Sequence, residues 1–396
     1  MFSIFPIKGS LSNIDGFYCD GISGGLKPKG ALDMGFIYSD TLCDIEAVFT
    51  SNNFKAAPLR HYLKYDDNFQ SNFILINSKN ANAMTGQKGI DDIDELFKEL
   101  QEKFPVIKNP VMSSTGVIGV RLPKEKILKN ALNFNLSNKN GENLSNAIMT
   151  TDSYPKNCFY EVKLEDGTSF KIGAIAKGAG MINPNLATML CFICTDASIP
   201  KEDMKELLQE NSITTFNAIS VDGDTSTNDT VILMANKKSN AYNKEAFKEA
   251  LRLVMHDMAM MMVADGEGAK KAVAFEVNGA LNDEDAQVVS KALSNSLLVK
   301  TALFGEDPNW GRIASTIGAS GVKCDESTLT ITFKDVLVYN KGEILFDQDM
   351  EKEAAKVLEN KEFKVICDLG IGTGSFTAYG CDLGYDYVKI NADYRT

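Results

Sequence analysis

The sequence predicts a mixed α/β fold in which sheets are layered with helices. Short apolar runs bounded by polar or glycine-containing segments are typical of buried strands. They alternate along the chain with longer stretches whose apolar residues recur at helical spacing. A chain of 396 residues can also bury most of its apolar surface. We therefore expect two or three domains, or one large composite, that fold without disulfides or a structural metal.

Individual elements follow from local patterns. Residues 73–76 are continuously apolar and predict a buried strand, whereas residues 93–104 carry apolar side chains at helical spacing. Two further helices are predicted, over Lys244–Ala264 and Glu284–Leu303. The first has a methionine-rich face, which is typical of an adaptable core. Strict alternation over Thr328–Phe333 predicts a half-exposed strand.

Composition excludes several classes of function. The net charge of −12 makes nucleic acid and anionic membranes poor partners. No apolar run approaches 18 residues, and the N-terminal residues do not form a signal peptide pattern. Eight irregularly spaced cysteines fit a reducing cytoplasm better than a disulfide framework. His61 and His256 are the only histidines, which argues against a histidine-based triad and a multi-histidine metal site. We expect neither a bound metal nor a bound cofactor.

Three motifs favour ordinary structure over function. Gly370–Ser375 lacks the third glycine of a dinucleotide fingerprint and precedes a strand-like segment, so it predicts a tight turn. Asp222–Ser226 begins like a calcium loop but lacks the later glycine and glutamate, which favours a structured turn. Cys191 and Cys194 form a lone CxxC in an apolar run and are predicted to be buried strand thiols.

The most informative segment covers residues 177–194. Glycines at alternate positions lead into an Asn-Pro-Asn turn, and Ala187-Thr188 then opens an apolar run. From spacing alone, Thr188 is an ordinary strand residue. A threonine hydroxyl becomes a good nucleophile only beside a base, and its own α-amino group can serve once the preceding peptide bond is cut. That amine, with a pKa of roughly 7.7–8.0, suits catalysis near neutral pH.

The segment resembles the self-cleavage site of the ornithine acetyltransferase (glutamate N-acetyltransferase) family of arginine biosynthesis. The resemblance extends along the chain in six further blocks, which together are far more specific than any single glycine motif. These blocks are Ser114–Gly119, Ala147–Asp152 with Pro155 and Lys156, Asn217–Asp229, Asp265–Ala269, Asp307–Arg312 and Tyr387–Thr396. Three departures are Lys79 in place of glycine, Met84 in place of cysteine, and Gly384 where threonine is common. Because of these departures, the resemblance does not predict the backbone conformation around Lys79.

The resemblance implies a role for Thr188 in two reactions. The chain would cut itself between Ala187 and Thr188, and Thr188 would then accept the acetyl group of N2-acetylornithine and release ornithine. Glutamate would attack the acetyl-threonine ester and leave as N-acetylglutamate. Thr115 and Gly116 match the oxyanion hole, one through its hydroxyl and the other through its backbone N–H.

The resemblance also implies the substrate site. The matching positions are Thr151, Lys177, Thr188, Glu267, Asn391 and Thr396. Because N2-acetylornithine carries a carboxylate and an ammonium, we expect Lys177 to meet the former and Glu267 the latter. Asn391 and the terminal carboxylate of Thr396 would complete the ammonium site, anchored by a strand over Tyr387–Ile390.

The implied architecture is the α/β fold of the self-processing ornithine acetyltransferase and D-aminopeptidase type, with N-terminal-nucleophile chemistry. Fragment 1–187, the alpha chain, would supply the oxyanion hole and part of the substrate site. Fragment 188–396, the beta chain, would supply the nucleophile and the substrate-binding C-terminus. The expected assembly is an α2β2 heterotetramer.

Two alternatives stay open at this point. A self-processing amidohydrolase or aminopeptidase of the same fold would use a similar nucleophile, although those relatives typically carry serine there. A degenerate family member could instead act as a binding protein. Within the family, some members also make N-acetylglutamate with acetyl-CoA as a co-substrate, and no motif separates the two kinds.

Overall fold

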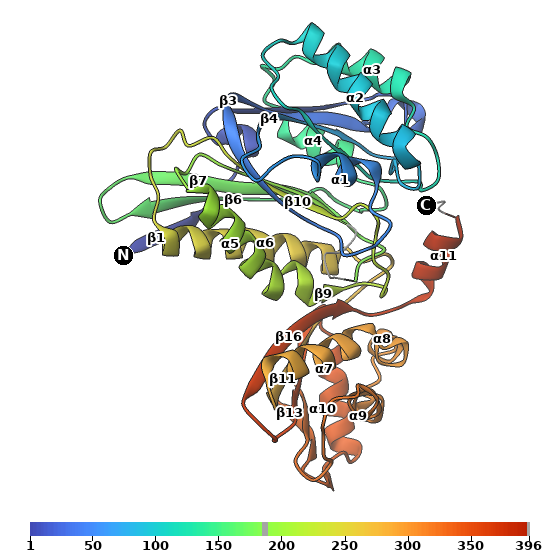
Figure 1. Ribbon diagram of the computed structural model, residues 1–396. Helices are drawn as coiled ribbons and strands as arrows, with labels where there is room; N and C mark the ends of the chain where they lie inside the picture. Colours follow the sequence, from blue (N-terminus) through green and yellow to red (C-terminus); the bar gives the residue numbers. More distant parts are fainter. Residues whose placement is uncertain (184–188, 394–396) are drawn as a thin grey trace.

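The structure is a computed structural model that describes residues 1–183 and 189–393. It contains two sheets, each covered by helices (Figure 1). In spatial order, the larger sheet comprises β1 (Phe2–Pro6), β6 (Lys156–Leu164), β7 (Ser169–Lys177), β8 (Leu190–Thr195), β10 (Thr230–Ala235), β3 (Met34–Phe49), β4 (Gln70–Asn77) and β5 (Val111–Ser114), and β2 (Phe17–Ile22) also pairs with β3. The predicted α/β fold of layered sheets and helices is confirmed.

Helices cover both faces of the larger sheet. Buried residues of α5 (Lys201–Thr214) and α6 (Lys244–Ala264) pack against one face. Residues of α4 (Gly141–Ile148) pack on the other face. The remaining helices of this lobe pack near β3, β4 and β5; they are α1 (Ala57–Tyr62), α2 (Gly86–Lys103) and α3 (Lys124–Ala131). Short 3-10 turns occur at Leu11–Asn13, Pro28–Gly30 and Phe216–Ala218.

The smaller sheet forms a second lobe. In spatial order it comprises β14 (Glu343–Ile344), β13 (Val336–Asn340), β12 (Thr330–Phe333), β15 (Glu362–Asp368), β11 (Ala272–Ala280), β16 (Gly374–Cys381) and β9 (Ile219–Ser220). Its helices are α7 (Asp283–Asn295), α8 (Leu297–Phe304), α9 (Trp310–Ala319) and α10 (Gln348–Leu358). The last helix, α11 (Tyr385–Asp393), leaves this lobe and runs back toward the larger sheet (Figure 1).

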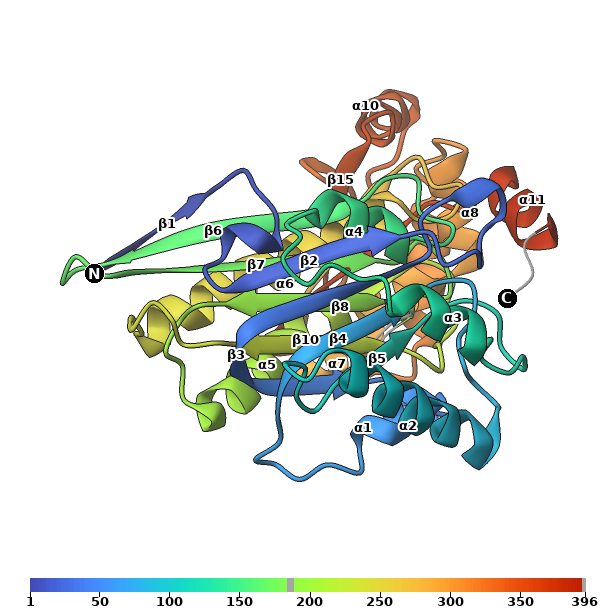
Figure 2. The ribbon, with the colours of Figure 1, turned by 90° about the horizontal axis from the view of Figure 1, so that it is seen from above.

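The predicted fragments are interleaved in the larger sheet. Strands β8 and β10 come from residues after 188, yet they lie between β7 and β3, which come from residues before 187 (Figure 2). Leu190 pairs with Lys177 of β7 in the antiparallel direction and with Thr230 of β10 in the parallel direction. Fragments 1–187 and 188–396 would therefore share one sheet rather than form two separate domains.

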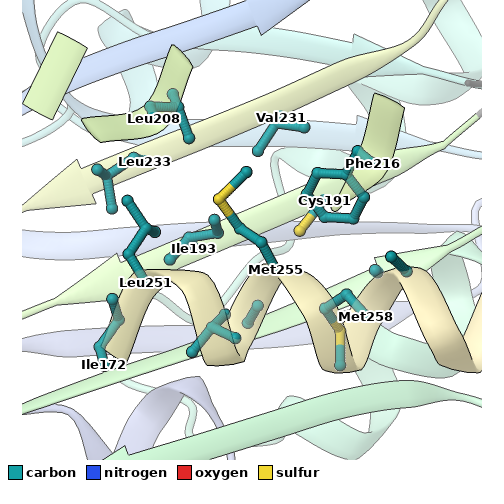
Figure 3. Packing of buried hydrophobic residues seen from close by; sticks show 14 of the residues in the cluster. Ile172, Cys191, Ile193, Leu208, Phe216, Val231, Leu233, Leu251, Met255 and Met258 are labelled. Atoms are coloured by element: carbon teal, nitrogen blue, oxygen red, sulfur yellow. The ribbon is translucent and has the colours of Figure 1, made fainter. Parts of the chain in front are cut away.

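The core under the larger sheet contains the methionines predicted to be buried. Met255 and Met258 of α6 pack with Cys191 and neighbouring strand residues (Figure 3). Cys191 and Cys194 are both buried in β8 and belong to clusters on opposite faces of the sheet. The predictions of an adaptable methionine core and of buried strand thiols are confirmed.

Two predicted elements differ from the structure. Glu284–Leu303 was expected to form one helix, which is wrong because the chain is extended at Ser296, whose hydroxyl caps α8 by accepting from the Val299 amide at 3.4 Å. Tyr387–Ile390 was expected to form a strand, but it lies in α11. Because no residue of α11 is buried, no sheet holds this short apolar run as a strand.

The other predicted elements are confirmed. Residues 73–76 lie in β4, and residues 93–103 lie in α2. The strand predicted over Thr328–Phe333 appears as β12, with every second residue buried. Gly370–Ser375 joins β15 to β16 through a turn in which Gly370 has φ +64°. Within the two described ranges, no helix combines the length and apolarity that crossing a bilayer requires.

Replacing Met255 by alanine should destabilise the protein, because the side chain is fully buried between α6 and the sheet. We expect the free energy of unfolding to fall by about 2–5 kcal/mol. Equilibrium urea unfolding measures the effect, with Met84→Ala as the control because Met84 is 61% exposed. Equal unfolding midpoints for the two variants would contradict this account of the core.

Candidate active site

The residues predicted from sequence converge on one pocket. Its lining includes six of them, namely Thr115, Gly116, Thr151, Lys177, Glu267 and Asn391. The other predicted site residues, Thr188 with its neighbour Ala187 and Thr396, lie outside the described residues. The pocket forms where β5 and β7 end and where β10 begins, and α11 contributes one wall.

Gly116 provides a backbone N–H donor at the pocket. The amides of its neighbours Thr115 and Val117 donate to the carbonyls of Asn77 and Lys79 at 3.0 and 3.2 Å. No acceptor among the described residues takes up the Gly116 N–H, which borders the pocket. Gly116 has φ +133°, and a Cβ would lie 2.2 Å from the Lys79 carbonyl carbon, so the position requires glycine. The segment therefore offers a fixed N–H to an incoming oxyanion.

Lys177 orients the second candidate donor. Its Nζ lies 3.4 Å from Thr115 Oγ1 and donates to it. Because that hydroxyl accepts from the ammonium, its own hydrogen is free to point elsewhere. Lys177 is only 3% exposed, and burial lowers the pKa of its ammonium despite the opposing effect of Asp152. A buried ammonium and a hydroxyl thus stand beside the Gly116 N–H.

A buried ion network supports Lys177. Asp152 accepts from Lys156 Nζ at 2.8 Å and from the Gly178 amide at 2.7 Å. Lys156 also donates to Asp265 at 2.6 Å. Burial alone would raise the pKa of Asp152, but the ammoniums of Lys177 and Lys156 outweigh it and lower the pKa to about 2. The carboxylate therefore stays charged and fixes the start of the glycine-containing segment.

Glu267 and Asn391 form the acidic wall of the pocket. Asn391 Nδ2 donates to Glu267 Oε2 at 2.6 Å, and the Glu267 amide donates to the Ala179 carbonyl at 2.8 Å. The carboxylate packs on Gly180, where a Cβ would lie 2.3 Å from it. The pocket thus presents a fixed carboxylate opposite in charge to Lys177, and both line the same space.

The segment predicted as a structured turn does more than turn the chain. Asp222 accepts from the amides of Met181 and Ile182 at 2.6 and 2.8 Å, and from the Tyr387 hydroxyl at 3.2 Å. Burial raises the pKa of Asp222. Burial also raises the pKa of Tyr387. One carboxyl group thereby ties α11 to the backbone that precedes the predicted cut.

The backbone that follows the predicted nucleophile is also anchored. The amide of Met189 donates to Asp229 Oδ1 at 3.2 Å. Asp229 is fully buried, which raises the pKa of its carboxyl well above the usual range. Its Oδ2 has no hydrogen-bond partner in the part of the chain that the structure describes. In the same part of the chain, no group of three or more His, Cys, Asp and Glu side chains is placed to hold a metal ion.

Comparisons with known proteins identify the family. The model of the ArgJ family matches residues 18–396. The arginine biosynthesis bifunctional protein ArgJ of Wolinella succinogenes is 60% identical over 396 residues, which is all of both chains. The chain belongs to the ArgJ family. The family membership predicted from the sequence blocks is confirmed.

Two further relatives extend this result. A protein of Methanopyrus kandleri named glutamate N-acetyltransferase is 40% identical to this chain over 94% of its length and 98% of the relative's. A crystal structure of ArgJ from Bacillus halodurans is 41% identical and superposes with a TM-score of 0.50. The match covers 52% of this chain and the whole of the solved chain.

The structure accounts for one departure from the usual ArgJ pattern, at Gly384, and shows the cost of another, at Lys79. Lys79 has φ +71°, a conformation that favours the family's glycine and costs a lysine about 1–2 kcal/mol. At Gly384, a Cβ would lie 2.3 Å from the ring of Phe304, so threonine would require that ring to move. Nothing in the structure explains why Met84, which is exposed at φ +58°, replaces cysteine.

Sequence reasoning missed several residues of this ArgJ pocket. Asp222, Asn228 and Tyr387 line it, and Asp152 supports it from behind. All four lie in blocks that resembled the family, so block membership was the available signal. Their partners are mostly backbone groups far away in the sequence, which no local pattern reveals.

Replacing Asp152 by asparagine should destabilise the protein in a pH-dependent way. At pH 7 the change removes one of the two carboxylates that pair with Lys156 and the carboxylate with the largest effect on the buried Lys177, and we expect a loss of about 3–5 kcal/mol. Because the folded pKa of about 2 lies below the unfolded value of about 4, the contribution is present above pH 4 and disappears as pH falls toward 2. Urea unfolding of both proteins between pH 7 and the lowest pH at which they fold measures the difference.

The matched control for this series is Asp166→Asn, since Asp166 is exposed and accepts only from Thr168 within a turn. Its stability should stay close to that of the unmodified protein at every pH. A difference between unmodified protein and Asp152→Asn that does not shrink below pH 4 would rule out the ion pairing described above.

Proposed function

We propose that this chain transfers the acetyl group of N2-acetylornithine to glutamate in arginine biosynthesis, giving ornithine and N-acetylglutamate. The full-length identity to an ArgJ protein supports this activity. The observation that carries it is the N–H of Gly116, which has no acceptor among the described residues, beside the Thr115 hydroxyl in a pocket whose walls also hold Lys177 and Glu267. Acyl transfer needs donors for an oxyanion, and an amino-acid substrate needs partners for both of its charges.

Thr188 is the nucleophile in this proposal, exposed when the chain cuts itself after Ala187. The backbone of the next residue, Met189, is anchored, because its amide donates to Asp229 Oδ1 at 3.2 Å. A second observation supports the cut. Residues 188–396 are 209 of the chain's 396 residues, about 53%, and the solved Bacillus halodurans chain matches 52% of this chain over its whole length.

The chemistry proceeds in two balanced halves. The Thr188 α-amine takes the proton of its own hydroxyl, the oxygen attacks the acetyl carbonyl carbon, and the amide C–N bond breaks as the departing nitrogen of ornithine is protonated. The amine of glutamate then attacks the acetyl ester and regenerates the hydroxyl. In each half, the carbonyl oxygen becomes negative and is met by the Gly116 N–H and the Thr115 hydroxyl.

The charged walls assign the ends of the substrate. Glu267, held by Asn391, is the partner for an ammonium, and Thr151 lines the same pocket. Lys177 is the partner for a carboxylate, and its contact with Thr115 gives it a second role in orienting the oxyanion hole. The terminal carboxylate of Thr396 stays a prediction, since Thr396 lies outside the described residues.

The bifunctional name of the Wolinella relative supports a second activity, the synthesis of N-acetylglutamate with acetyl-CoA as acetyl donor. The same acetyl-threonine ester serves both donors, so acetyl-CoA enters as a co-substrate and no bound cofactor is required. The interleaved sheet supports an inseparable pair of fragments. The α2β2 arrangement of two such pairs and a cytoplasmic location complete the proposal, the latter supported by eight cysteines that are all free thiols.

Intact-mass spectrometry under denaturing conditions tests the nucleophile. We expect two fragments that meet between Ala187 and Thr188, with one acetyl group added only to the second fragment after incubation with N2-acetylornithine. Thr188→Ala should give a single uncut chain, whereas Thr188→Ser, which keeps the hydroxyl, should still be cut. An uncut chain in the unmodified protein would contradict the mechanism, and cut fragments that never carry acetyl would favour a hydrolase.

Replacing Glu267 by glutamine tests the ammonium site, because glutamine keeps the shape and the acceptor for Asn391 but removes the charge. We expect ornithine to bind about 10- to 100-fold more weakly, as measured by calorimetric titration. Glu306→Gln is the control, since Glu306 pairs with Lys271 and does not line the pocket. Unchanged binding to Glu267→Gln would assign the ammonium to another wall.

A further inference from the structure

We propose that Asn228 is a positioning residue that holds the oxyanion hole, Thr115 and Gly116, in a fixed position relative to the nucleophile strand. We use this name for β8, the strand that follows Thr188. The inference rests on the proposed function, because it presumes that Thr115 and Gly116 stabilise an oxyanion. Asn228 lies just before β10, lines the pocket and is only 5% exposed.

The side chain of Asn228 uses its hydrogen-bonding groups on fixed partners. Nδ2 donates to the carbonyl of Ser114 at 2.8 Å and to the carbonyl of Ala81 at 2.7 Å. Oδ1 accepts from the hydroxyl of Thr227 at 2.7 Å, which sets the orientation of the amide group. Ser114 directly precedes Thr115, so one of these bonds fixes the backbone at the entrance to the oxyanion hole.

The second bond fixes the other side of the same segment. The Ala81 amide donates to the Val117 carbonyl at 3.0 Å, and the Val117 amide donates to the Lys79 carbonyl at 3.2 Å. Residues 79–81 and 115–117 thus form a small ladder around Gly116. Because the Asn228 amide bridges both sides of this ladder, it determines where the Gly116 N–H points.

Asn228 also connects this ladder to the nucleophile strand. The next residue, Asp229, accepts from the amide of Met189, and Thr230 pairs with Leu190 of β8. The ladder belongs to fragment 1–187, whereas β8 and β10 belong to fragment 188–396. Asn228 therefore holds the oxyanion-hole segment of fragment 1–187, and the next residue, Asp229, holds the start of β8 in fragment 188–396. These two parts of the site must act on the same carbonyl group.

The consequence is a defect in rate rather than in binding. Donors of an oxyanion hole act on charge that develops in the transition state, so a shift in their position lowers kcat and leaves substrate binding unchanged. A misplacement of about 1 Å can cost on the order of 10²-fold in rate. A residue with a merely structural role would instead reduce the fraction of competent sites.

The experiment measures pre-steady-state acetylation of the full-length, self-processed protein by N2-acetylornithine. The amplitude of the acetyl-enzyme burst counts competent sites, and the burst rate reports the chemical step. For Asn228→Ala, normalised to the cut fraction seen by intact mass, we expect a burst rate lower by about 10²-fold at full amplitude and an unchanged dissociation constant for ornithine.

The matched control is Asn236→Ala, at the other end of β10. Asn236 is 7% exposed and also spans the two fragments, through a bond from its Nδ2 to the Asp15 carbonyl at 2.7 Å. Its burst rate should equal that of the unmodified protein. If Asn228→Ala does not fold or is not cut, Thr227→Val carries the test, because it removes only the hydroxyl that orients the amide and should lower the burst rate in the same direction.

The outcomes separate this inference from the proposed function. An unmodified protein that never forms acetyl-threonine overturns the proposed function before any variant is made. An unmodified protein that does so, together with normal burst rates in Asn228→Ala or, where that variant is not obtained, in Thr227→Val, overturns the positioning role alone. A reduced burst amplitude at a normal rate also overturns it, since that result assigns Asn228 a merely structural role.

Discussion

The placement of β8 and β10 between β7 and β3 is the constraint on which the site depends. The register sets Leu190 beside Lys177 on one side and beside Thr230 on the other. The end of β7 and the beginnings of β8 and β10 therefore meet at one edge of the sheet. Leu190 and Thr230, which are 40 positions apart in the chain, become neighbours there through the pairing of β8 with β10, and the pocket forms at that edge.

Burial of charge is the second consequence of this arrangement. Lys177 and Lys156 are almost completely buried, and such groups are tolerated only with close partners. Asp152 and Asp265 form ion pairs with Lys156, and Asp152 also attracts the ammonium of Lys177 and accepts from the backbone of Gly178. The low dielectric that makes burial of a charge costly also strengthens the electrostatic interactions of each charge that faces the pocket. The ion pairs of Lys156 with Asp152 and Asp265 thus fix the charges behind the site.

Sequence patterns correctly predicted the elements whose apolar residues recur at regular spacing over many positions. Helix α6 was predicted with its observed bounds because its apolar face persists over 21 residues. The break between α7 and α8 depends on one capping hydroxyl, at Ser296, and periodicity does not register a single cap. Helix α11 was mistaken for a strand because a short apolar run such as Tyr387–Ile390 fits either structure, and no burial of α11 distinguishes them.

In the candidate site, too, the sequence predicted some residues and missed others. The residues carried over by family resemblance do line one pocket, but resemblance names positions and not their supports. Asn228 and Asp152 escaped notice because an amide or carboxylate that binds a distant carbonyl or N–H leaves no periodic trace. At Lys79 the sequence did point to an unusual feature. The departure from the family's glycine raised a question about the backbone conformation, and the structure has a positive φ there.

A cut inside a sheet, rather than between domains, has a physical advantage for this chemistry. Breaking the link between β7 and β8 would remove one covalent connection, while the ladders from β8 to β7 and from β10 to β3 would remain. A new amino group would then appear in a pocket whose oxyanion donors and charged walls are already in place. Its position relative to Gly116 would be set by folding before the cut, so no later docking of two fragments is needed to bring base, nucleophile and oxyanion hole together.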